Sequence, residues 1–188
     1  MNNREVLLKC ALELFTSRGY DAVGVQEIVD CAGVTKPTLY HYFGNKSGLL
    51  IALLKEPFDP FFETLRSAAH YNGDVTMTLR AVAGAYFALA AAQPLLYRFY
   101  LSTLFAPPDS EPFRICQSLN ERQQQVMESL FANAAGYHGN LKGRQRAYAA
   151  SFLGIVNTYV TLSLNGAALL DDSMVYSVVH QFMHGIFS

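Results

Sequence analysis

A short polar stretch over residues 36–43 carries the side chains in this sequence that are best suited to chemistry at a surface. Leu39 and Phe43 lie one helical turn apart, so a helix here would leave the polar residues on its other faces. Ammonium, hydroxyl and imidazole groups of this size suit phosphate oxygens and the edges of bases. The stretch therefore predicts a helix that binds nucleic acid. Its polar members are Lys36, Thr38, Tyr40, His41 and Tyr42.

A second short helix is predicted immediately before this one, over residues 25–32, where apolar residues recur at spacings of three and four. Gly33 should end it, because glycine adopts the left-handed conformation of a sharp turn without a Cβ penalty. Thr35 can cap the next helix by accepting a backbone N–H, and Pro37 suits its first turn. A helix of this length is stable only when packed, because isolated helices below roughly 12–15 residues are marginal in water. Together these features predict a helix-turn-helix.

A longer pattern of apolar, glycine and aromatic residues runs through about the first 50 positions. It consists of Leu7, Ala11, Leu14, Phe15, Gly19 and Tyr20, the runs 32–36 and 38–43, Lys46 and Leu49. In this pattern the sequence resembles the TetR family of one-component bacterial transcription regulators. In that family the third helix enters the major groove of DNA. Aromatic residues near its end, and a lysine that opens the fourth helix, hold phosphates.

The resemblance implies a set of DNA-binding residues in this sequence. They are Gln26, Thr35, Lys36, Thr38, Tyr40, His41, Tyr42 and Lys46. Gly24 departs from the family pattern, which usually has a serine or threonine that caps the second helix and often touches a phosphate. Glycine is an acceptable cap but offers no hydroxyl. One backbone contact is therefore either missing or made by the main-chain N–H.

Composition bounds the class of protein. The 188 residues can bury roughly 70% of the surface that the unfolded chain exposes, and 51% are hydrophobic and 15% charged, which excludes a disordered tail. A net charge of −1 means that DNA binding must rely on placed contacts. Three cysteines form no metal-ligand spacing. Cys10 and Cys31 are expected to be buried thiols, which fits a reduced, cytoplasmic compartment.

The uncharged stretch 147–170 is long enough to raise the question of a membrane span. Its polar residues, among them Asn157, Thr161 and Asn165, argue against one. An apolar helix in a soluble protein is instead buried on more than one side, against its own domain and a second subunit. Charges at Arg4 and Lys9 interrupt any apolar run near the start, so no signal peptide is expected.

The predicted fold is all-α with about nine helices and two domains. Residues 1–46 form a helix-turn-helix DNA-binding domain, and residues 47–188 form a bundle for ligand binding and dimerisation. A kink or a restart of the helix is expected at Pro57 and Pro60, which either serves as a hinge between ligand and DNA binding or merely bends the helix around the core. The helices are predicted at about 3–18, 25–32, 36–43, 46–70, 74–92, 94–106, 111–136, 144–167 and 172–187.

An aromatic region at 81–108, with the single charge Arg98, can form either a core or a ligand pocket. A core is the default for such a stripe, but the TetR resemblance and the number of tyrosines, whose buried hydroxyls need partners, favour a pocket for a small, largely apolar organic ligand. No cofactor is expected, and no metal, because His180 and His184 lack an evident third ligand. The predicted ligand contacts are Phe62, Tyr86, Tyr97, Tyr100, Phe152 and Tyr159.

The last two helices carry more apolar surface than one packing partner requires, which predicts a homodimer through a four-helix interface. Two recognition helices would then address half-sites roughly 34–36 Å apart in a near-palindromic operator. The motifs G-x-S-x-G, H-E-x-x-H and a nucleotide-binding loop are missing from the sequence, so no enzyme is expected. The sequence thus predicts a TetR-like regulator, a repressor by the family's usual mode, that a ligand releases from DNA. The alternative is a ligand-binding or protein-interaction protein with weak or vestigial DNA binding.

Overall fold

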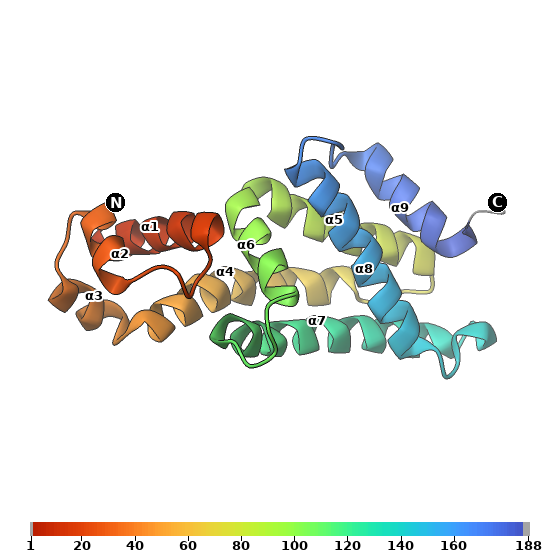
Figure 1. Cartoon of the computed structure of the whole chain (residues 1–188). Coiled ribbons are helices and arrows are strands. Elements are labelled where there is room, and N and C mark those ends of the chain that lie inside the picture. Colours follow the sequence, from red (N-terminus) through yellow and green to blue (C-terminus); the bar gives the residue numbers. More distant parts are fainter. Residues whose placement is uncertain (1, 186–188) are drawn as a thin grey trace. The chain divides into compact units, whose positions relative to one another are not determined.

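The computed structural model describes residues 2–185, and over that range the chain is all-α, as predicted (Figure 1). The described residues form nine α-helices and one short 3-10 helix, with no strand. The helices are α1 (Asn3–Arg18), α2 (Val25–Ala32), α3 (Lys36–Phe43), α4 (Lys46–Ala68), α5 (Val75–Ala92), α6 (Pro94–Leu104), α7 (Glu111–Ala135), η1 (Gly139–Leu141), α8 (Gln145–Leu164) and α9 (Asp172–His184).

The fourth helix differs from the prediction, because α4 continues through Pro57 and Pro60 without a restart. A proline nitrogen carries no hydrogen, so the carbonyls of Leu53 and Glu56 lose their partners four residues ahead. Apolar side chains compensate for the loss by holding the helix through packing. The buried residues of this stretch include Leu53, Leu54, Phe58, Phe61, Phe62 and Leu65.

Helices α1, α2 and α3 pack on one another around a small core. Its fully buried members include Leu7, Ala11, Phe15, Ile28, Val29 and Leu39. The Asn2 side chain caps α1 by accepting the Glu5 N–H at 2.9 Å. Gly33 ends α2 in the left-handed conformation, with φ 64° and ψ 31°, as predicted. This turn sets the direction in which α3 leaves α2.

Replacement of Gly33 by alanine should destabilise the fold by about 1–2 kcal/mol, the usual cost of placing a Cβ in the left-handed region. No heavy atom lies within 4 Å of the position such a Cβ would take, so the cost is conformational rather than a clash. Urea unfolding of both proteins measures the difference. Gly84→Ala is the matched control: it is helical and equally unobstructed, and should be neutral or stabilising by up to about 1 kcal/mol. Equal stability of Gly33→Ala and the parent would contradict the role of this turn.

The chain divides into two compact units. The first unit comprises Met1–Asp59 and Leu95–Leu119, and the second comprises Pro60–Pro94 and Asn120–Ser188. In the first unit, the Phe15 ring contacts the rings of Tyr20 and Phe99 at centroid distances of 5.1 and 5.9 Å. The contact with Phe99 packs α6 against α1. The functional boundary between residues 46 and 47 stays a prediction.

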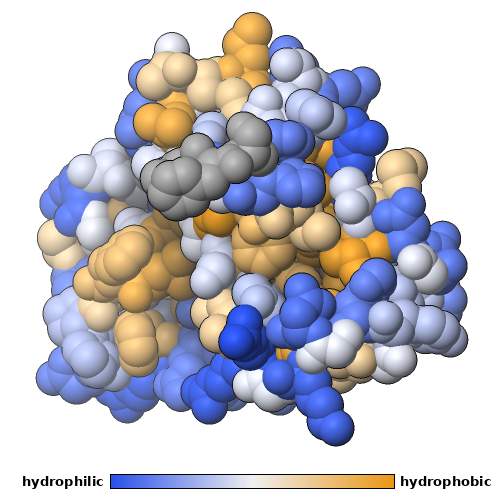
Figure 2. Space-filling view, turned by 90° about the vertical axis from the view of Figure 1, so that its right-hand side faces the viewer, coloured by the Kyte–Doolittle hydropathy of each residue, from blue (hydrophilic) through white to orange (hydrophobic). Residues whose placement is uncertain are grey.

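In the second unit, α5 packs on α8 and α9, and α8 packs on α9. The Tyr86 hydroxyl donates a hydrogen bond to Gln123 at 2.8 Å, which satisfies a phenol that is fully buried. The Arg122 guanidinium lies 3.8 Å from the centroid of the Phe62 ring. Figure 2 shows apolar side chains gathered on one face of the molecule among polar ones. Large apolar residues exposed in this unit are Met77, Tyr137, Leu162, Leu169, Tyr176 and Met183.

Two helices of the described chain, α5 and α8, are long and apolar enough to cross a membrane by length and composition alone. Core helices of soluble proteins pass the same test. The most apolar window of α5 is 44% buried and that of α8 only 22% buried in the single chain. Helix α8 therefore presents much uncharged surface outside the packing of its own unit.

Candidate nucleic-acid interface and ligand cavity

The predicted polar surface of α3 is exposed. Leu39 is fully buried on one side of the helix, while Tyr40 and Tyr42 are 46% and 40% exposed. Lys36 and His41 are also exposed, and Thr38 is half-buried. The rings of His41 and Tyr42 contact each other at 5.2 Å. The structure thus brings these five residues together on one short helix, four of them exposed and Thr38 half-buried.

Thr35 occupies the cap position of α3 but does not cap it as predicted, because its side chain accepts no backbone N–H. Its hydroxyl instead lies 3.1 Å from the Thr38 hydroxyl. The backbone carbonyl of Thr35 accepts the Thr38 N–H at 3.0 Å. The two hydroxyls form an exposed pair at the start of α3, and the role of this pair at DNA stays a prediction.

Residues at the start of α2 already have partners within the domain. The Gln26 amide donates to Asp30 at 2.7 Å. The Gly24 N–H donates to the Glu27 carboxylate at 2.9 Å, so this main-chain group is occupied rather than free for a phosphate. That hydrogen bond and an ion pair with Arg18 lower the pKa of Glu27. A DNA contact by Gln26 would have to replace or share its bond to Asp30.

Lys46 faces its own domain. Its ammonium donates to the Tyr20 carbonyl at 2.6 Å and lies 3.9 Å from the centroid of the Tyr20 ring. Burial lowers the pKa of Lys46 from its ordinary value. The side chain therefore ties the start of α4 to the turn after α1. A phosphate contact by Lys46 stays a prediction, and would use the remaining N–H groups of the ammonium.

Tyr20 forms a second tie within the first unit, because its hydroxyl donates to the Glu111 carboxylate at the start of α7. Burial, together with this bond, raises the pKa of Tyr20. Hydrogen bonds from Ser47 and Tyr20 lower the pKa of Glu111. Tyr20, Lys46, Ser47 and Glu111 thus connect the turn after α1 with α4 and α7. Sequence analysis missed Ser47 and Glu111, because their positions depend on a contact between distant segments.

Acid should weaken this connection. The lowered pKa of Glu111 means that its contribution to stability is complete above the unfolded pKa of about 4.3 and is lost as the pH falls through the lower folded value. Glu111→Gln should therefore reduce stability at pH 7 by about 1.5 kcal/mol, with a smaller difference from the parent at pH 3. Urea midpoints at the two pH values measure it. Tyr20→Phe should act in the same direction, and the double variant should lose less than the sum; additive losses would show that the two groups are independent.

The cysteines differ in exposure, and the prediction that Cys31 is buried is wrong. Cys31 is exposed on α2, whereas Cys10 is buried on α1. Burial, with the neighbouring Cys31 thiol, raises the pKa of Cys10 to about 12. Burial also raises the pKa of Cys116 to about 11, and the Thr103 hydroxyl lies 2.7 Å from its sulfur. Cys10 and Cys116 are therefore protonated core thiols at neutral pH.

The six predicted ligand contacts fall in different compact units. Tyr97 and Tyr100 lie in the first unit, with ring centroids 5.7 Å apart. The other four lie in the second unit, where the Tyr159 hydroxyl donates to Gln181 at 2.9 Å. Five of the six are buried, and Tyr159 is half-buried. Their ligand role stays a prediction. The four in the second unit are Phe62, Tyr86, Phe152 and Tyr159.

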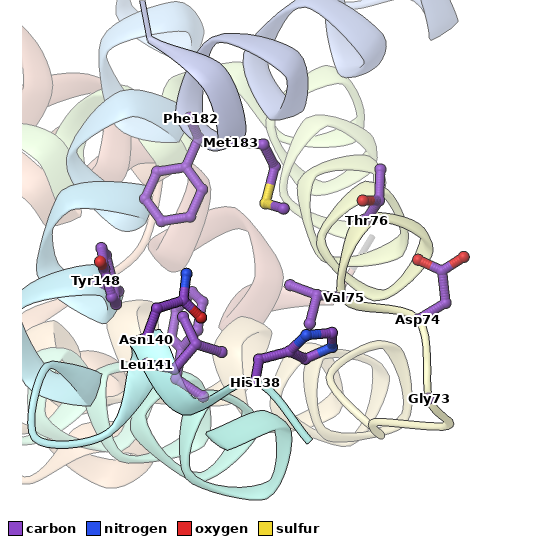
Figure 3. Close-up of a pocket in the computed structure, with 11 residues that line it drawn as sticks. Gly73, Asp74, Val75, Thr76, His138, Asn140, Leu141, Tyr148, Phe182 and Met183 are labelled. Carbon is purple, nitrogen blue, oxygen red and sulfur yellow. The ribbon is translucent and has the colours of Figure 1, made fainter. Parts of the chain in front are cut away.

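The second unit contains a cavity of about 330 Å³ between the start of α5, the end of α7, the η1 turn, α8 and α9 (Figure 3). None of the six predicted ligand residues lines it. Phe152 borders it through the Phe182 ring, at a centroid distance of 5.0 Å. Sequence analysis missed most of the lining because it comes from turns and helix ends. The lining includes Val75, Phe131, His138, Asn140, Tyr148 and Phe182.

Helices α1 to α3, with a left-handed glycine between α2 and α3 and an exposed polar face on α3, define a helix-turn-helix domain followed by further helices. Residues 7–53 match the family described as bacterial regulatory proteins, tetR family. Over this segment the chain is similar to the TetR family.

Relatives of known role agree with this assignment. The chain is 42% identical over 84 residues to the HTH-type transcriptional activator FasR of Mycolicibacterium smegmatis, an alignment that spans 45% of this chain and 38% of FasR. It is 39% identical over 74 residues to the transcriptional regulator AcuR of Cereibacter sphaeroides, spanning 39% of this chain and 33% of AcuR. The chain thus spans well under half of the length of these curated relatives. Both are transcription regulators rather than enzymes.

The fold extends the likeness beyond the aligned segment. The transcriptional regulator FadR of Bacillus subtilis, solved in complex with stearoyl-CoA, superposes with a TM-score of 0.77 at 22% identity, covering 97% of this chain and 98% of FadR. A putative fatty acid metabolism regulator of Clostridium perfringens superposes with a TM-score of 0.82 at 18% identity, covering 96% of this chain and 98% of that protein. At these identities the likeness shows that the chain has the fold of these regulators.

Proposed function

We propose that this chain is a transcription regulator that binds a near-palindromic operator as a homodimer and that a small, largely apolar ligand releases it. The observation that carries the proposal is the exposed polar face of α3, with Leu39 anchored beneath it in the helix-turn-helix. Its action is repression, the usual mode of the TetR family.

The proposed DNA contacts fall into two groups. Thr38 and His41 read base edges, while Lys36, Tyr40 and Tyr42 hold phosphates. Thr35 and Gln26 add contacts at the edges of this surface, and Lys46 contributes through its remaining donors. This division assigns sequence preference to a few side chains and affinity to the rest.

The proposed homodimer forms through α8 and α9, at residues 145–164 and 172–184. Support comes from the uncharged surface that α8 leaves outside its own unit. It also comes from apolar side chains on the same region that are 40% or more exposed, including Leu162 and Tyr176. A two-fold axis through these helices buries that surface and presents two α3 helices to DNA. The protein then acts in the cytoplasm, where the operator lies.

The proposed ligand binds within residues 47–188. FadR of Bacillus subtilis, whose fold this chain shares, was solved with stearoyl-CoA, which supports an effector with an apolar part. Release requires that the ligand bind better to the conformation that does not fit the operator. The chain acts by binding and carries out no catalysis.

The alternative is a ligand-binding or interaction protein whose DNA-binding domain is weak. The net charge of −1, and the partners already held by Gln26, Gly24 and Lys46, favour it. If these hydrogen-bond donors stay with their present partners, the domain would bind DNA only through a weak, sequence-independent attraction to phosphates.

Selection of bound genomic fragments, followed by titration of the best fragment at several salt concentrations, separates the two functions. A regulator should recover a near-palindromic site and lose affinity with a slope of about −0.9 in log–log units per phosphate neutralised. Sedimentation should show a dimer in the presence and absence of that fragment. A weak, sequence-independent response or a monomer would overturn the proposal in favour of the alternative.

A further inference from the structure

One wall of the cavity in the second unit is a continuous aromatic surface contributed by three helices. Phe131 of α7, Tyr148 of α8 and Phe182 of α9 contact one another, with ring centroids 5.8 to 6.1 Å apart. Figure 3 shows Tyr148 and Phe182 at the border of the same space. Three mutually contacting rings favour a ligand that offers a π-face of its own, because aromatic pairs gain about 0.5–1.5 kcal/mol beyond the burial of area.

The lining residues that the structure describes also include polar groups, but no lysine or arginine. His138 and Asn140 contribute an imidazole and an amide, and the Tyr71 hydroxyl lies 3.2 Å from Nε2 of His138, which orients that ring. The Asp74 carboxylate already accepts the Met77 N–H as the cap of α5. These groups supply hydrogen bonds and no fixed positive charge, so they suit a neutral molecule with a hydroxyl or carbonyl group.

The volume limits the size of the ligand. Small-molecule sites span about 300–1,000 Å³, and a cavity of about 330 Å³ lies at the lower end of that range. It accommodates one or two fused rings, whereas a long acyl chain would have to leave it. Leu141 and Met183, which point toward the open space in Figure 3, complete the apolar lining.

We propose that this cavity binds a neutral aromatic molecule of one or two rings, which stacks against Phe131, Tyr148 and Phe182 and forms a hydrogen bond with His138 or Asn140. The proposal rests on the proposed function only in assigning this molecule the role of effector. Binding to the cavity itself requires no DNA.

Titration calorimetry of the full chain with 1-naphthol, a neutral bicyclic phenol, tests the binding. We expect one molecule per chain, and at least a tenfold loss of affinity in Leu141→Trp and in Met183→Trp, because each indole fills the cavity from a different segment. Met77→Trp is the matched control. Met77 is 55% exposed and lies outside the lining, so this variant should bind within twofold of the parent.

Circular dichroism establishes which variants are folded, and one folded cavity variant is sufficient for the test. No binding of 1-naphthol, or equal binding in the parent and a folded cavity variant, would overturn the site. Decanoate is titrated in parallel: tighter binding than 1-naphthol, with the same loss in the cavity variants, would overturn the aromatic class.

A titration of the selected DNA fragment with and without 1-naphthol is a separate readout, which tests the effector role. Unchanged DNA affinity would remove the effector role while leaving the site intact, and a chain that never binds DNA would refute the proposed function alone.

Discussion

Replacement of Tyr42 by alanine should weaken binding to duplex DNA by about 10- to 100-fold at every sequence, while leaving the protein folded. The side chain is 40% exposed on α3, so little packing is lost. The proposed contact is a hydrogen bond from its hydroxyl to a phosphate, and a hydrogen bond to a charged group contributes about 1.5–3 kcal/mol. Such a loss corresponds to roughly one to two decades in affinity. Fluorescence anisotropy with the selected fragment and with scrambled DNA measures both affinities.

Tyr137→Ala is the matched control for this experiment. Tyr137 is 81% exposed and belongs to the second unit, so its removal should leave DNA affinity unchanged. Thr38→Ala and His41→Ala should instead change the ranking of operator variants, because these residues are assigned to base edges. A uniform loss in all three α3 variants would refute the division into phosphate and base contacts. Unchanged affinity in Tyr42→Ala would remove this side chain from the interface.

Leu39→Ala should destabilise the amino-terminal domain by about 2–5 kcal/mol, the range for truncating a buried leucine. Leu39 is fully buried and is the buried residue of α3. Without it, α3 loses the anchor that holds an otherwise unstable eight-residue helix against α1 and α2. Specific DNA binding should then be lost together with the helix. Urea unfolding followed by circular dichroism, and anisotropy at the same temperature, measure the two losses.

The adjacent Tyr40→Ala provides the contrast. Tyr40 is 46% exposed, so this variant should change unfolding by no more than about 0.5 kcal/mol while still weakening DNA binding. The two variants distinguish Leu39, which holds the helix in place by packing, from Tyr40, which the helix exposes to DNA. If Leu39→Ala unfolded at the same urea concentration as the parent, packing of α3 would not depend on this side chain.

The sequence predicted the amino-terminal domain closely because its signals are local. Helical periodicity and a glycine in the left-handed region determine where α2 ends and α3 begins, and both helices have the predicted bounds. Three details of this domain were not predicted. The Thr35 hydroxyl turns to Thr38 instead of the backbone, Lys46 turns to the Tyr20 carbonyl, and Cys31 is exposed.

The candidate ligand site was harder to predict for the same reason. Tyrosines were chosen by residue type and helical spacing, which cannot tell a satisfied core hydroxyl from one that faces a ligand. Tyr86 illustrates this, since its hydroxyl is bonded to Gln123, a residue 37 positions away. The cavity instead lies where the turn before α8 meets the start of α5 and the end of α9. None of its three aromatic members, Phe131, Tyr148 and Phe182, was among the predicted ligand contacts.

The unbroken course of α4 through its two prolines has a mechanical consequence. A helix resists bending because hydrogen bonds join each turn to the next. In α4 the carbonyls of Leu53 and Glu56 each lack such a bond, because the residues four positions ahead are prolines. Helix α4 is therefore expected to bend most easily over a single turn near its middle, although it is continuous there. A small load applied along α4 is expected to concentrate its curvature at this turn and to leave the flanking segments straight.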